Sequence, residues 1–498
     1  MSLIPPIDLL QMDEVRIDPM LALKLPVQVA LRREVLPFVE WNGNVIVACA
    51  DDRDTGAFSM VQRAFDKPIQ TRLAEPASLK RALQRVYGAL RAGSAPPTFG
   101  RPNGNRAGES DFTDVAALSD EILYSALLRQ ASDIHLDPTP EYLRLRFRVD
   151  GGLEEIQRYP VALTGNLVNR FKVLAQMDIS EKRAPQDGAF RYTYAENKHL
   201  DLRAATLPTK WGERVTLRLL GLQTGTLTLE RLGMDTAHLK HFSSALAQPH
   251  GMILLTGPTG SGKSTTLYAG IRRLLDSESL NVITVEDPVE YDIAGVAQVS
   301  VDSNDKTSFA KALRSILRHD PDVVMIGEIR DGETAGIAVK AALTGHLVFS
   351  SLHTNTAAGA VTRMSDMGVE RYLIASTLRL SIAQRLVKRL CARCRVETAL
   401  TEVQAMALNQ PLAAGRQAYL PGGCLYCGGR GHVGRVALFE FLPLDDSWSQ
   451  IINRGAQEVE LLEEMNRRGM PTLIDDALLK MSAGVSSFDE INSAVAAW

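Results

Sequence analysis

The sequence predicts an α/β protein of several domains, on three observations. The chain has 498 residues, whereas one domain usually has about 100–200 residues. From about residue 226, short apolar runs alternate with helical patterns, which is typical of a mostly parallel sheet with helices on both faces. Gly257–Ser264 lies between such a run and a helical stretch, and it fits the phosphate-binding pattern G-x-x-x-x-G-K-S. The last part of the chain, 441–498, is expected to be helical.

Composition and charge exclude several classes of protein. Hydrophobic residues make up 45% of the chain and charged residues 23%, which are ordinary values for globular proteins. The net charge of −3 gives no support to a nucleic-acid-binding protein, which usually has a basic domain. No apolar run reaches the ~18 residues of a membrane span, and the N-terminal residues lack the regions of a secretory signal. We therefore expect a cytoplasmic protein that binds no nucleic acid.

Before residue 226 the sequence predicts two small α/β units and a linker between them. In the first unit, two apolar runs flank Asn42-Gly43, a pair typical of hairpin turns. Residues 91–110 are rich in Gly, Pro, Ser and Asn and have no apolar period, as in a flexible linker. In the second unit, YLRLRFRVDG alternates apolar residues with arginines, so one face of this strand should be buried. The arginine face is either a solvated surface or a binding surface for a partner or a phosphate.

The phosphate-binding pattern lies between a strand expected at 252–256 and a helix expected at 264–275. Glycines let backbone N–H groups approach phosphate oxygens, and the N-terminus of the following helix favours anions. Lys263 should neutralise the β- and γ-phosphates, and the Ser264 hydroxyl should bind Mg²⁺. The sequence therefore predicts a nucleoside triphosphate site, lined by Gly257, Pro258, Thr259, Gly260, Ser261, Gly262, Lys263, Ser264 and Thr265.

Acidic residues follow two further strands of the expected sheet. Glu286 and Asp287 end the strand at 282–286, and Glu328 follows the strand at 323–327. Ligands of a parallel sheet lie beyond the carboxyl ends of its strands, so these carboxylates should converge on the phosphates. One should hold the metal through water and another should deprotonate the attacking water, with helix capping as the alternative for either acidic pair. The Gly-Glu end and the lack of an N-K-x-D sequence argue against a small GTPase.

Two histidines, His346 and His353, flank the next strand, expected at 347–351. A single histidine is usually an ordinary core or surface group. Two of them, with Thr354 and Asn355 at the end of a core strand, are expected to sense phosphate.

Four of the five cysteines form two C-x-x-C pairs that are 29 residues apart. In a reducing compartment, this spacing is typical of a tetrahedral Zn²⁺ site with four thiolates. The expected ligands are Cys391, Cys394, Cys424 and Cys427. Cys49 lies alone in an apolar run and is expected in the core.

Four motifs, GPTGSGKST, ITVEDPVEY, GEIRD and TGHLVFSSLHTN, together resemble those of the traffic ATPases of type II secretion and type IV pilus assembly. ASDIHLDP, RAPQDGAF and LPTKWGERVTLRLL precede them, and IAQRLVKRLC, the cysteine pairs and GHVGRVALFEFL follow, so the resemblance covers about 111–445. It implies a hexameric, Mg²⁺-dependent ATPase with a RecA-like core, which works on the cytoplasmic face of the bacterial inner membrane. The implied partners are an inner-membrane anchor protein, bound by the N-terminal domain, and a polytopic platform protein.

The resemblance also implies roles for single residues. Lys263 and Ser264 match the nucleotide lysine and the metal-binding serine of the family. Glu286 matches the glutamate that activates water, and Glu328 matches the glutamate of the metal-side strand, which would hold Mg²⁺ with Ser264. His353 matches the second histidine of the family's histidine box. The implied ligands are therefore ATP, Mg²⁺ and Zn²⁺.

Two arginines of the preceding domain, Arg203 and Arg218, match those that the family swings toward the γ-phosphate as arginine fingers. The chain departs from the family at 1–110, which matches loosely, and at Ala189 and Phe190, where arginine is usual. Zinc modules and long N-terminal regions occur in the extension and secretion ATPases, whereas retraction ATPases usually lack them.

The resemblance therefore favours a motor that powers pseudopilus assembly in type II secretion, with type IV pilus extension as the alternative. The rival interpretations are a DNA translocase and a zinc-bearing scaffold with an inactive phosphate loop. The acidic isoelectric point argues against the first, and the complete set of catalytic residue types argues against the second. The expected segments are a partner-docking domain (1–90), a flexible linker (91–110), a second α/β domain that supplies arginines (111–225), a RecA-like core (226–385), a zinc module (386–440) and a helical end (441–498).

Overall fold

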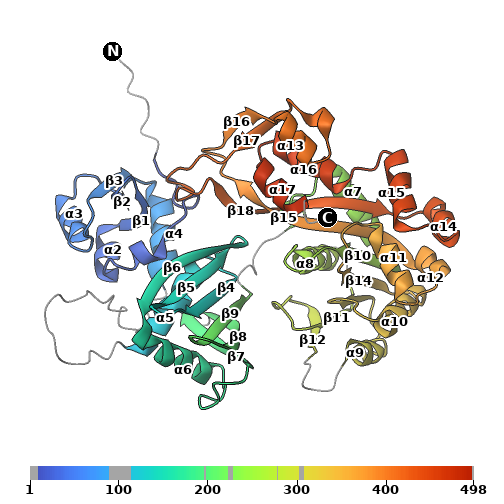
Figure 1. The fold of residues 1–498 in the computed structure, drawn as a ribbon, viewed down its shortest axis with the longest axis horizontal. Coiled ribbons are helices and arrows are strands. Elements are labelled where there is room, and N and C mark those ends of the chain that lie inside the picture. The colour runs from blue at the N-terminus through green and yellow to red at the C-terminus, as the bar shows by residue number, and fades with distance from the viewer. Residues whose placement is uncertain are drawn as a thin grey trace. The chain divides into compact units, whose positions relative to one another are not determined.

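The computed structural model of the chain forms two compact units, which Figure 1 shows in one picture and which we describe separately. The first unit spans Met1–Leu222 and Gly422–Val433, and the second spans Gln223–Pro421 and Gly434–Trp498. The expected linker at 91–110 and residues 222–225, at the end of the expected second domain, lie outside the described residues. The structure describes residues 9–88, 114–195, 198–221, 228–276, 279–301 and 308–495.

The first unit begins with a small domain that has a three-stranded sheet. β1 pairs antiparallel with β2, and β2 pairs parallel with β3. Asn42 and Gly43 join β1 to β2 with φ values of 50° and 78°, the left-handed conformations that a tight hairpin turn requires, which confirms the predicted hairpin. Cys49 is fully buried, as expected, and burial raises the pKa of its thiol to about 11. The elements are α1 (Pro19–Ala22), α2 (Val27–Arg33), β1 (Val35–Trp41), β2 (Asn44–Cys49), α3 (Thr55–Gln62), β3 (Ile69–Leu73) and α4 (Pro76–Tyr87).

The second domain of this unit is a six-stranded sheet in the order β6-β5-β4-β9-β8-β7. Its neighbouring strands pair antiparallel throughout. In β5 the apolar residues are buried and the residues between them are half-buried, as the alternating sequence predicts. The elements are α5 (Val115–Leu128), β4 (Asp133–Pro138), β5 (Tyr142–Val149), β6 (Gly152–Pro160), η2 (Val161–Leu163), α6 (Thr164–Leu174), β7 (Gln186–Ala195), β8 (Lys198–Thr209) and β9 (Gly212–Leu220).

The second unit is built on a seven-stranded sheet in the order β12-β11-β13-β14-β10-β15-β18. β10 pairs parallel with both β14 and β15, and β13 pairs parallel with β11 and β14. Met252 and Leu254 belong to one hydrophobic cluster, whereas Ile253 and Leu255 belong to another, so the sheet buries both faces. The predicted fold class, a parallel sheet covered on both sides, is confirmed.

The four predicted core strands are confirmed to within one residue, and three further strands were not predicted. β15 reads as a mixture of apolar and basic residues, and β12 is short and half-exposed, so neither has a clear strand pattern. The strands are β10 (Gly251–Thr256), β11 (Val282–Glu286), β12 (Val296–Ser300), β13 (Val323–Ile326), β14 (Leu347–Leu352), β15 (Leu378–Leu390) and β18 (His432–Pro443). The helices are α7 (Thr236–Leu246), α8 (Lys263–Leu275), α9 (Phe309–Ile316), α10 (Gly332–Leu343), α11 (Gly359–Asp366) and α12 (Arg371–Thr377).

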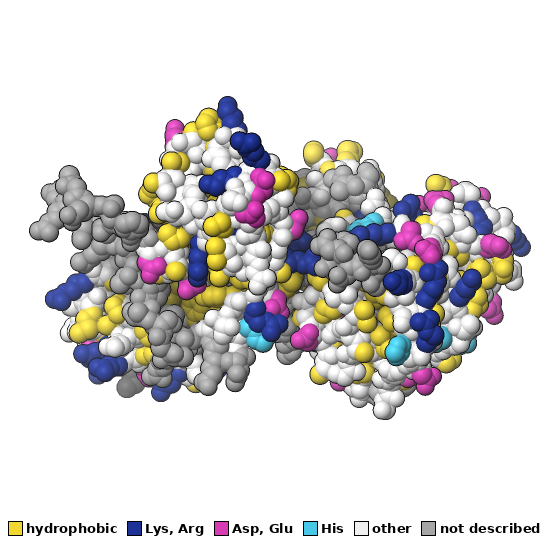
Figure 2. Space-filling view, turned by 90° about the horizontal axis from the view of Figure 1, so that it is seen from below, with side chains coloured by type: hydrophobic (Ala, Val, Ile, Leu, Met, Phe, Trp, Pro, Cys, Tyr) yellow, Lys and Arg dark blue, Asp and Glu magenta, His cyan; other side chains and the backbone are white. Residues whose placement is uncertain are grey.

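An insertion between β15 and β18 carries a two-stranded sheet, and the end of the chain is helical as predicted. The insertion contains β16 (Val396–Ala399), α13 (Glu402–Ala407), η3 (Pro411–Ala413) and β17 (Gln417–Leu420). The helical end contains α14 (Asp446–Asn453), α15 (Glu458–Arg467), α16 (Leu473–Ser482) and α17 (Phe488–Val495). Within the described ranges, no helix is both long and apolar enough to cross a bilayer. On the face in Figure 2, basic and acidic side chains lie interspersed, in keeping with the small net charge.

Candidate active site: a phosphate loop beside buried carboxylates

The phosphate loop leaves the fully buried strand β10 and enters α8 at Lys263. Two of its glycines are required by its shape. Gly257 has a φ of 144°, and a Cβ there would lie 2.5 Å from the backbone oxygen of Gln384. Gly262 has a φ of 89°, and its Cβ would lie 2.8 Å from Gln384 Nε2. Any other residue at these positions would be strained and would push the loop away from β15.

Gln384 holds the loop in place and was not predicted as a site residue. Its Nε2 donates to the backbone oxygen of Ser261 at 2.9 Å, and its Oε1 accepts from the Thr266 hydroxyl at 2.8 Å. The side chain is buried, so both of its polar ends are satisfied by the loop and by the first turns of α8. Gln384 lies within the IAQRLVKRLC stretch, but a single glutamine in a strand carries no pattern that indicates this contact.

Lys263 lies against the loop that it is expected to serve. Its Nζ donates to the backbone oxygens of Gly257 at 2.8 Å and Pro258 at 3.1 Å, and the residue is 9% exposed. Burial lowers the pKa of its ammonium group to about 8. The Ser261 hydroxyl is buried and has no hydrogen-bond partner among the described residues. An ammonium group and a buried donor on a glycine loop at a helix N-terminus fit a phosphate group, as predicted.

Glu286 ends β11 and is 4% exposed. Three donors surround its carboxylate. The Tyr268 hydroxyl donates to Oε2, the Thr284 hydroxyl donates to Oε1 at 2.6 Å, and Gln298 Nε2 donates to Oε1 at 3.2 Å. A buried carboxylate with three donors is fixed in orientation. None of the three donors was predicted as part of the site.

Glu328 follows β13 and is hydrogen-bonded to a histidine and an arginine. His353, directly after β14, places Nε2 2.9 Å from Glu328 Oε2, and Arg330 donates to Oε1. Burial alone would raise the pKa of Glu328, but the hydrogen bonds from Arg330 and His353 outweigh it, so the pKa is lowered. Arg330 also lies 3.9 Å from Asp287. The expected convergence of carboxylates at this edge of the sheet therefore includes a histidine and an arginine, and the arginine was not predicted as a site residue.

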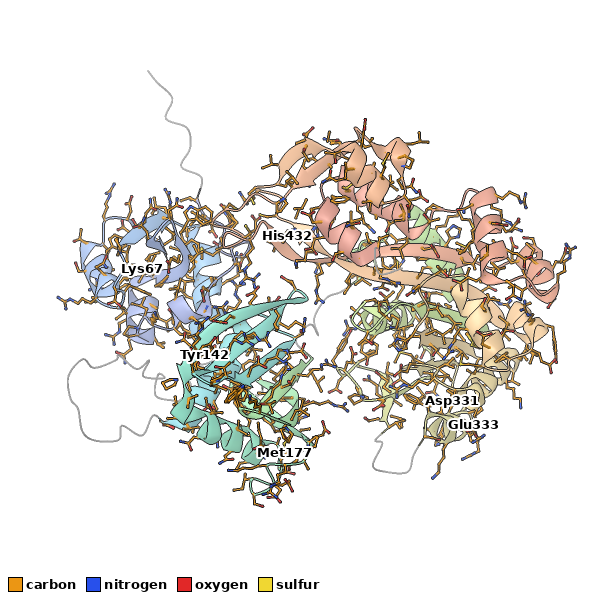
Figure 3. The ribbon with its side chains drawn as sticks, in the orientation of Figure 1. Lys67, Tyr142, Met177, Asp331, Glu333 and His432 are labelled. Atoms are coloured by element: carbon orange, nitrogen blue, oxygen red, sulfur yellow. The ribbon has the colours of Figure 1, made fainter. Side chains whose placement is uncertain are left out.

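The prediction that both histidines sense phosphate is wrong for His346. Its Nδ1 lies 2.9 Å from the backbone oxygen of Ala341, before β14 begins. The six residues of β14 separate it from His353, a distance of about 20 Å at roughly 3.3 Å per residue. The two histidines lie at opposite ends of one strand, so His346 closes the turn after α10. Asp331 and Glu333, labelled in Figure 3, lie at the other end of α10, where Asp331 caps the helix.

Arg203 and Arg218 lie directly opposite each other on β8 and β9 in the second domain of the first unit. Both are exposed, so two like charges face each other, an arrangement that is unfavourable without an anion. Arg218 Nε donates to Asp133 Oδ1 at 2.9 Å, and Arg148 lies 3.6 Å from Asp133 Oδ2. The arginine face of this sheet is therefore partly an ion-pair network built on the aspartates of ASDIHLDP.

The four predicted cysteines form a cluster in which all sulfur atoms lie within 4.8 Å of one another. The sulfur atoms of Cys424 and Cys427 are 3.8 Å apart, and a tetrahedron with Zn–S bonds of about 2.3 Å has edges of about 3.8 Å. Backbone N–H groups of Cys424 and Gly431 donate to Cys427 Sγ at 3.3 and 3.1 Å, which favours a thiolate. The donor set fits Zn²⁺, and a closed set of four thiolates would give the ion a structural role.

We expect one Zn²⁺ per chain, measured by elemental analysis of the purified protein. Cys424→Ser should lower both the zinc content and the thermal stability, because metal binding orders a cluster of this kind. Cys49→Ala is the matched control, since this buried cysteine lies outside the cluster, and it should leave the zinc content unchanged. Purified protein without metal, or full zinc retention in Cys424→Ser, would contradict the assignment.

We expect nucleotide affinity to weaken as the pH rises above about 8. Below that pH, Lys263 already carries the positive charge that a triphosphate requires. Above it, Lys263 must take up a proton when the nucleotide binds, so the affinity should fall by up to about tenfold per pH unit. Titration of a non-hydrolysable ATP analogue from pH ~7 to ~9.5 measures this dependence. Lys263→Ala should bind weakly at every pH and lose the slope. A wild-type affinity that does not change with pH would show that Lys263 stays charged throughout.

Comparison with known proteins places these features in one family. Residues 108–493 match the family described as "Type II/IV secretion system protein", and residues 6–93 match the MshEN domain. The type II secretion system protein E of Aeromonas hydrophila is 45% identical over 381 residues, 76% of this chain and 75% of that protein. The type IV pilus assembly ATPase PilB of Myxococcus xanthus is 38% identical over 504 residues, 98% of this chain and 88% of PilB.

Solved structures of related motors have the same fold. The pilus retraction motor PilT with bound ADP has a TM-score of 0.53 and 27% identity, over 75% of this chain and 96% of PilT. The ATPase DotB of Legionella pneumophila has a TM-score of 0.59 at 24% identity, over 79% of this chain and 98% of DotB, and supports the fold alone. Because the family match spans the phosphate loop, the carboxylates and the cysteine cluster, this chain belongs to the type II/IV secretion system protein family.

Proposed function

We propose that this chain hydrolyses ATP to power the assembly of a pseudopilus and thereby protein export by type II secretion. The observation that carries the proposal is the edge of the parallel sheet, where the phosphate loop follows β10, Glu286 ends β11 and Glu328 follows β13, all strands of one sheet. The 45% identity to proteins named type II secretion system protein E supports it independently.

The residues of the site have distinct roles in this proposal. Lys263 and the loop N–H groups bind the β- and γ-phosphates, and Ser264 and Glu328 hold Mg²⁺, which would neutralise charge on the phosphate oxygens. Glu286 orients a water molecule in line with the γ-phosphate and accepts its proton. His353, bonded to Glu328, reports the state of the phosphates to the loop after β14.

Arg203 and Arg218 complete the site when the second α/β domain closes on the nucleotide. In this proposal ATP binds first through the phosphate loop alone. Closure then brings two guanidinium groups to the charge that develops on the transferred phosphate, so hydrolysis is gated by domain motion.

The proposed assembly is a homo-hexamer at the cytoplasmic face of the bacterial inner membrane. The N-terminal domain, 1–90, docks an inner-membrane anchor protein, and the ring passes its motion to a polytopic platform protein. The supporting observations are the family membership, the three-stranded sheet of the N-terminal domain and the match of this domain to a named domain of its own.

Type IV pilus extension is the second candidate, and one observation favours it. PilB matches 98% of this chain, whereas the secretion relatives match about three quarters of it, so the N-terminal region is shared with the pilus ATPase over nearly its full length. The two machines assemble similar fibres, and the catalytic chemistry is the same in both candidates.

We expect the double variant Arg203→Ala/Arg218→Ala to keep most of its ATP affinity and to lose about 10³-fold in turnover, the lower range for a missing arginine finger. Steady-state hydrolysis and nucleotide titration measure the two quantities separately. Arg191→Ala is the matched control, because Arg191 lies exposed on the same sheet and pairs with Asp201. Near-normal turnover in the double variant would rule out the gating role.

Replacement of the chromosomal gene by the Glu286→Gln variant tests which machine this chain powers. A variant that binds ATP without hydrolysing it should stop the export of secreted proteins and leave surface pili intact if the chain serves type II secretion. Loss of pili with normal export would establish the second candidate. Normal export and normal piliation together would contradict the proposed function.

A further inference from the structure

Tyr268 connects the phosphate-loop helix to the carboxylate that is proposed to activate water. It lies on α8, five residues after Lys263, and its hydroxyl donates to Glu286 Oε2 at the end of β11. The side chain is fully buried. The hydroxyl also accepts from the backbone N–H of Glu290, 3.4 Å away. The contact therefore spans α8, β11 and the loop after β11.

The ring of Tyr268 is held as firmly as its hydroxyl. Tyr291 packs edge-on against it, with ring centroids 4.5 Å apart and an interplanar angle of 89°. The guanidinium of Arg272 lies 5.3 Å from the centroid of the Tyr291 ring. Because the ring is fixed by these contacts, its hydroxyl has one position. The position of Glu286 Oε2 therefore depends on the position of α8.

The charges around the pair keep the proton on the tyrosine. Burial and the neighbouring carboxylate of Glu286 raise the pKa of the Tyr268 hydroxyl, and these effects outweigh the backbone hydrogen bond from Glu290, which lowers it. The hydroxyl is therefore a donor at every physiological pH. Thr284 and Gln298 donate to the other oxygen, Oε1, so Tyr268 is the donor that orients Oε2.

We propose that Tyr268 is a positioning residue for Glu286, whose carboxylate it holds in one orientation relative to the phosphate loop. The inference rests on the proposed role of Glu286 in hydrolysis. A phenylalanine at this position would fill the same space but leave Oε2 without its side-chain donor. A carboxylate that loses a donor becomes easier to protonate.

The alternative is that Tyr268 only fills the core beneath the phosphate loop. In that case Tyr268→Phe would lower thermal stability and leave the pH dependence of hydrolysis where it was. A positioning role has a different signature, because it acts on the protonation state of another residue. The two interpretations are therefore separated by the pH profile of turnover.

The experiment compares Tyr268→Phe with Tyr291→Phe, which removes a hydroxyl from the adjoining ring. We expect Tyr268→Phe to bind ATP with an affinity within about twofold of wild type. The pH at which turnover falls on the acidic side should rise by about one to two pH units, which corresponds to the free energy of one hydrogen bond to a charged group. Tyr291→Phe should leave that pH unchanged. Thr284→Val, which removes a donor from Oε1, should move it in the same direction as Tyr268→Phe and serves if the latter fails to fold.

Glu286→Gln separates failure of this inference from failure of the proposed function. If Glu286→Gln hydrolyses ATP normally, Glu286 is not the base and the proposed function of the site is wrong. If Glu286→Gln stalls while Tyr268→Phe has a wild-type pH profile, the site is correctly assigned and the positioning role of Tyr268 is wrong. An equal shift in Tyr291→Phe would also overturn it, because the effect would then belong to the aromatic cluster.

Discussion

The parallel pairing of β10 with β14 and β15 is the constraint on which the site depends. Parallel strands end at the same edge of a sheet. The phosphate loop after β10, Glu328 after β13 and His353 after β14 therefore lie at one edge. The same pairing brings Gln384 of β15 beneath the loop. Its amide group makes the hydrogen bonds to Ser261 and Thr266 that water would otherwise make. Loss of this pairing would separate residues that are as far apart in the sequence as Ser261 and Gln384, 123 positions.

Burial gives each site residue its chemical character. Lys263 loses solvent and therefore holds its proton less firmly, while the carboxylate of Glu286 accepts three hydrogen bonds that compensate for its loss of water. Glu328 is hydrogen-bonded to the Arg330 guanidinium and to the His353 ring instead. One carboxylate is therefore held by hydroxyl and amide donors and the other by an arginine and a histidine, so the two lie in different environments.

The sequence predicts the parts of the site that depend on local chemistry. The phosphate loop, the strand ends at Glu286 and Glu328 and the cysteine pairs all have recognisable spacing, and the four core strands have clear apolar runs. Tyr268, Gln298 and Gln384 were not predicted, because their roles come from contacts between distant elements, and a tyrosine on a helix or a glutamine in a strand has no pattern of its own. His346 shows the opposite case, since its spacing to His353 indicated a shared site, while a strand of six residues in fact holds the two apart.

The ion pair of Arg218 is consistent with a guanidinium group that moves during the reaction. Its side chain is 64% exposed, and an exposed pair contributes only about 0–1 kcal/mol, so separation from Asp133 costs little. Asp133 itself is only 8% exposed, and a buried carboxylate left alone would be costly. Arg148 lies 3.6 Å from the other oxygen of Asp133, so the aspartate would keep a cationic partner if the proposed closure drew Arg218 away. Asp133 therefore orients Arg218 without holding it strongly, which the proposed arginine finger requires.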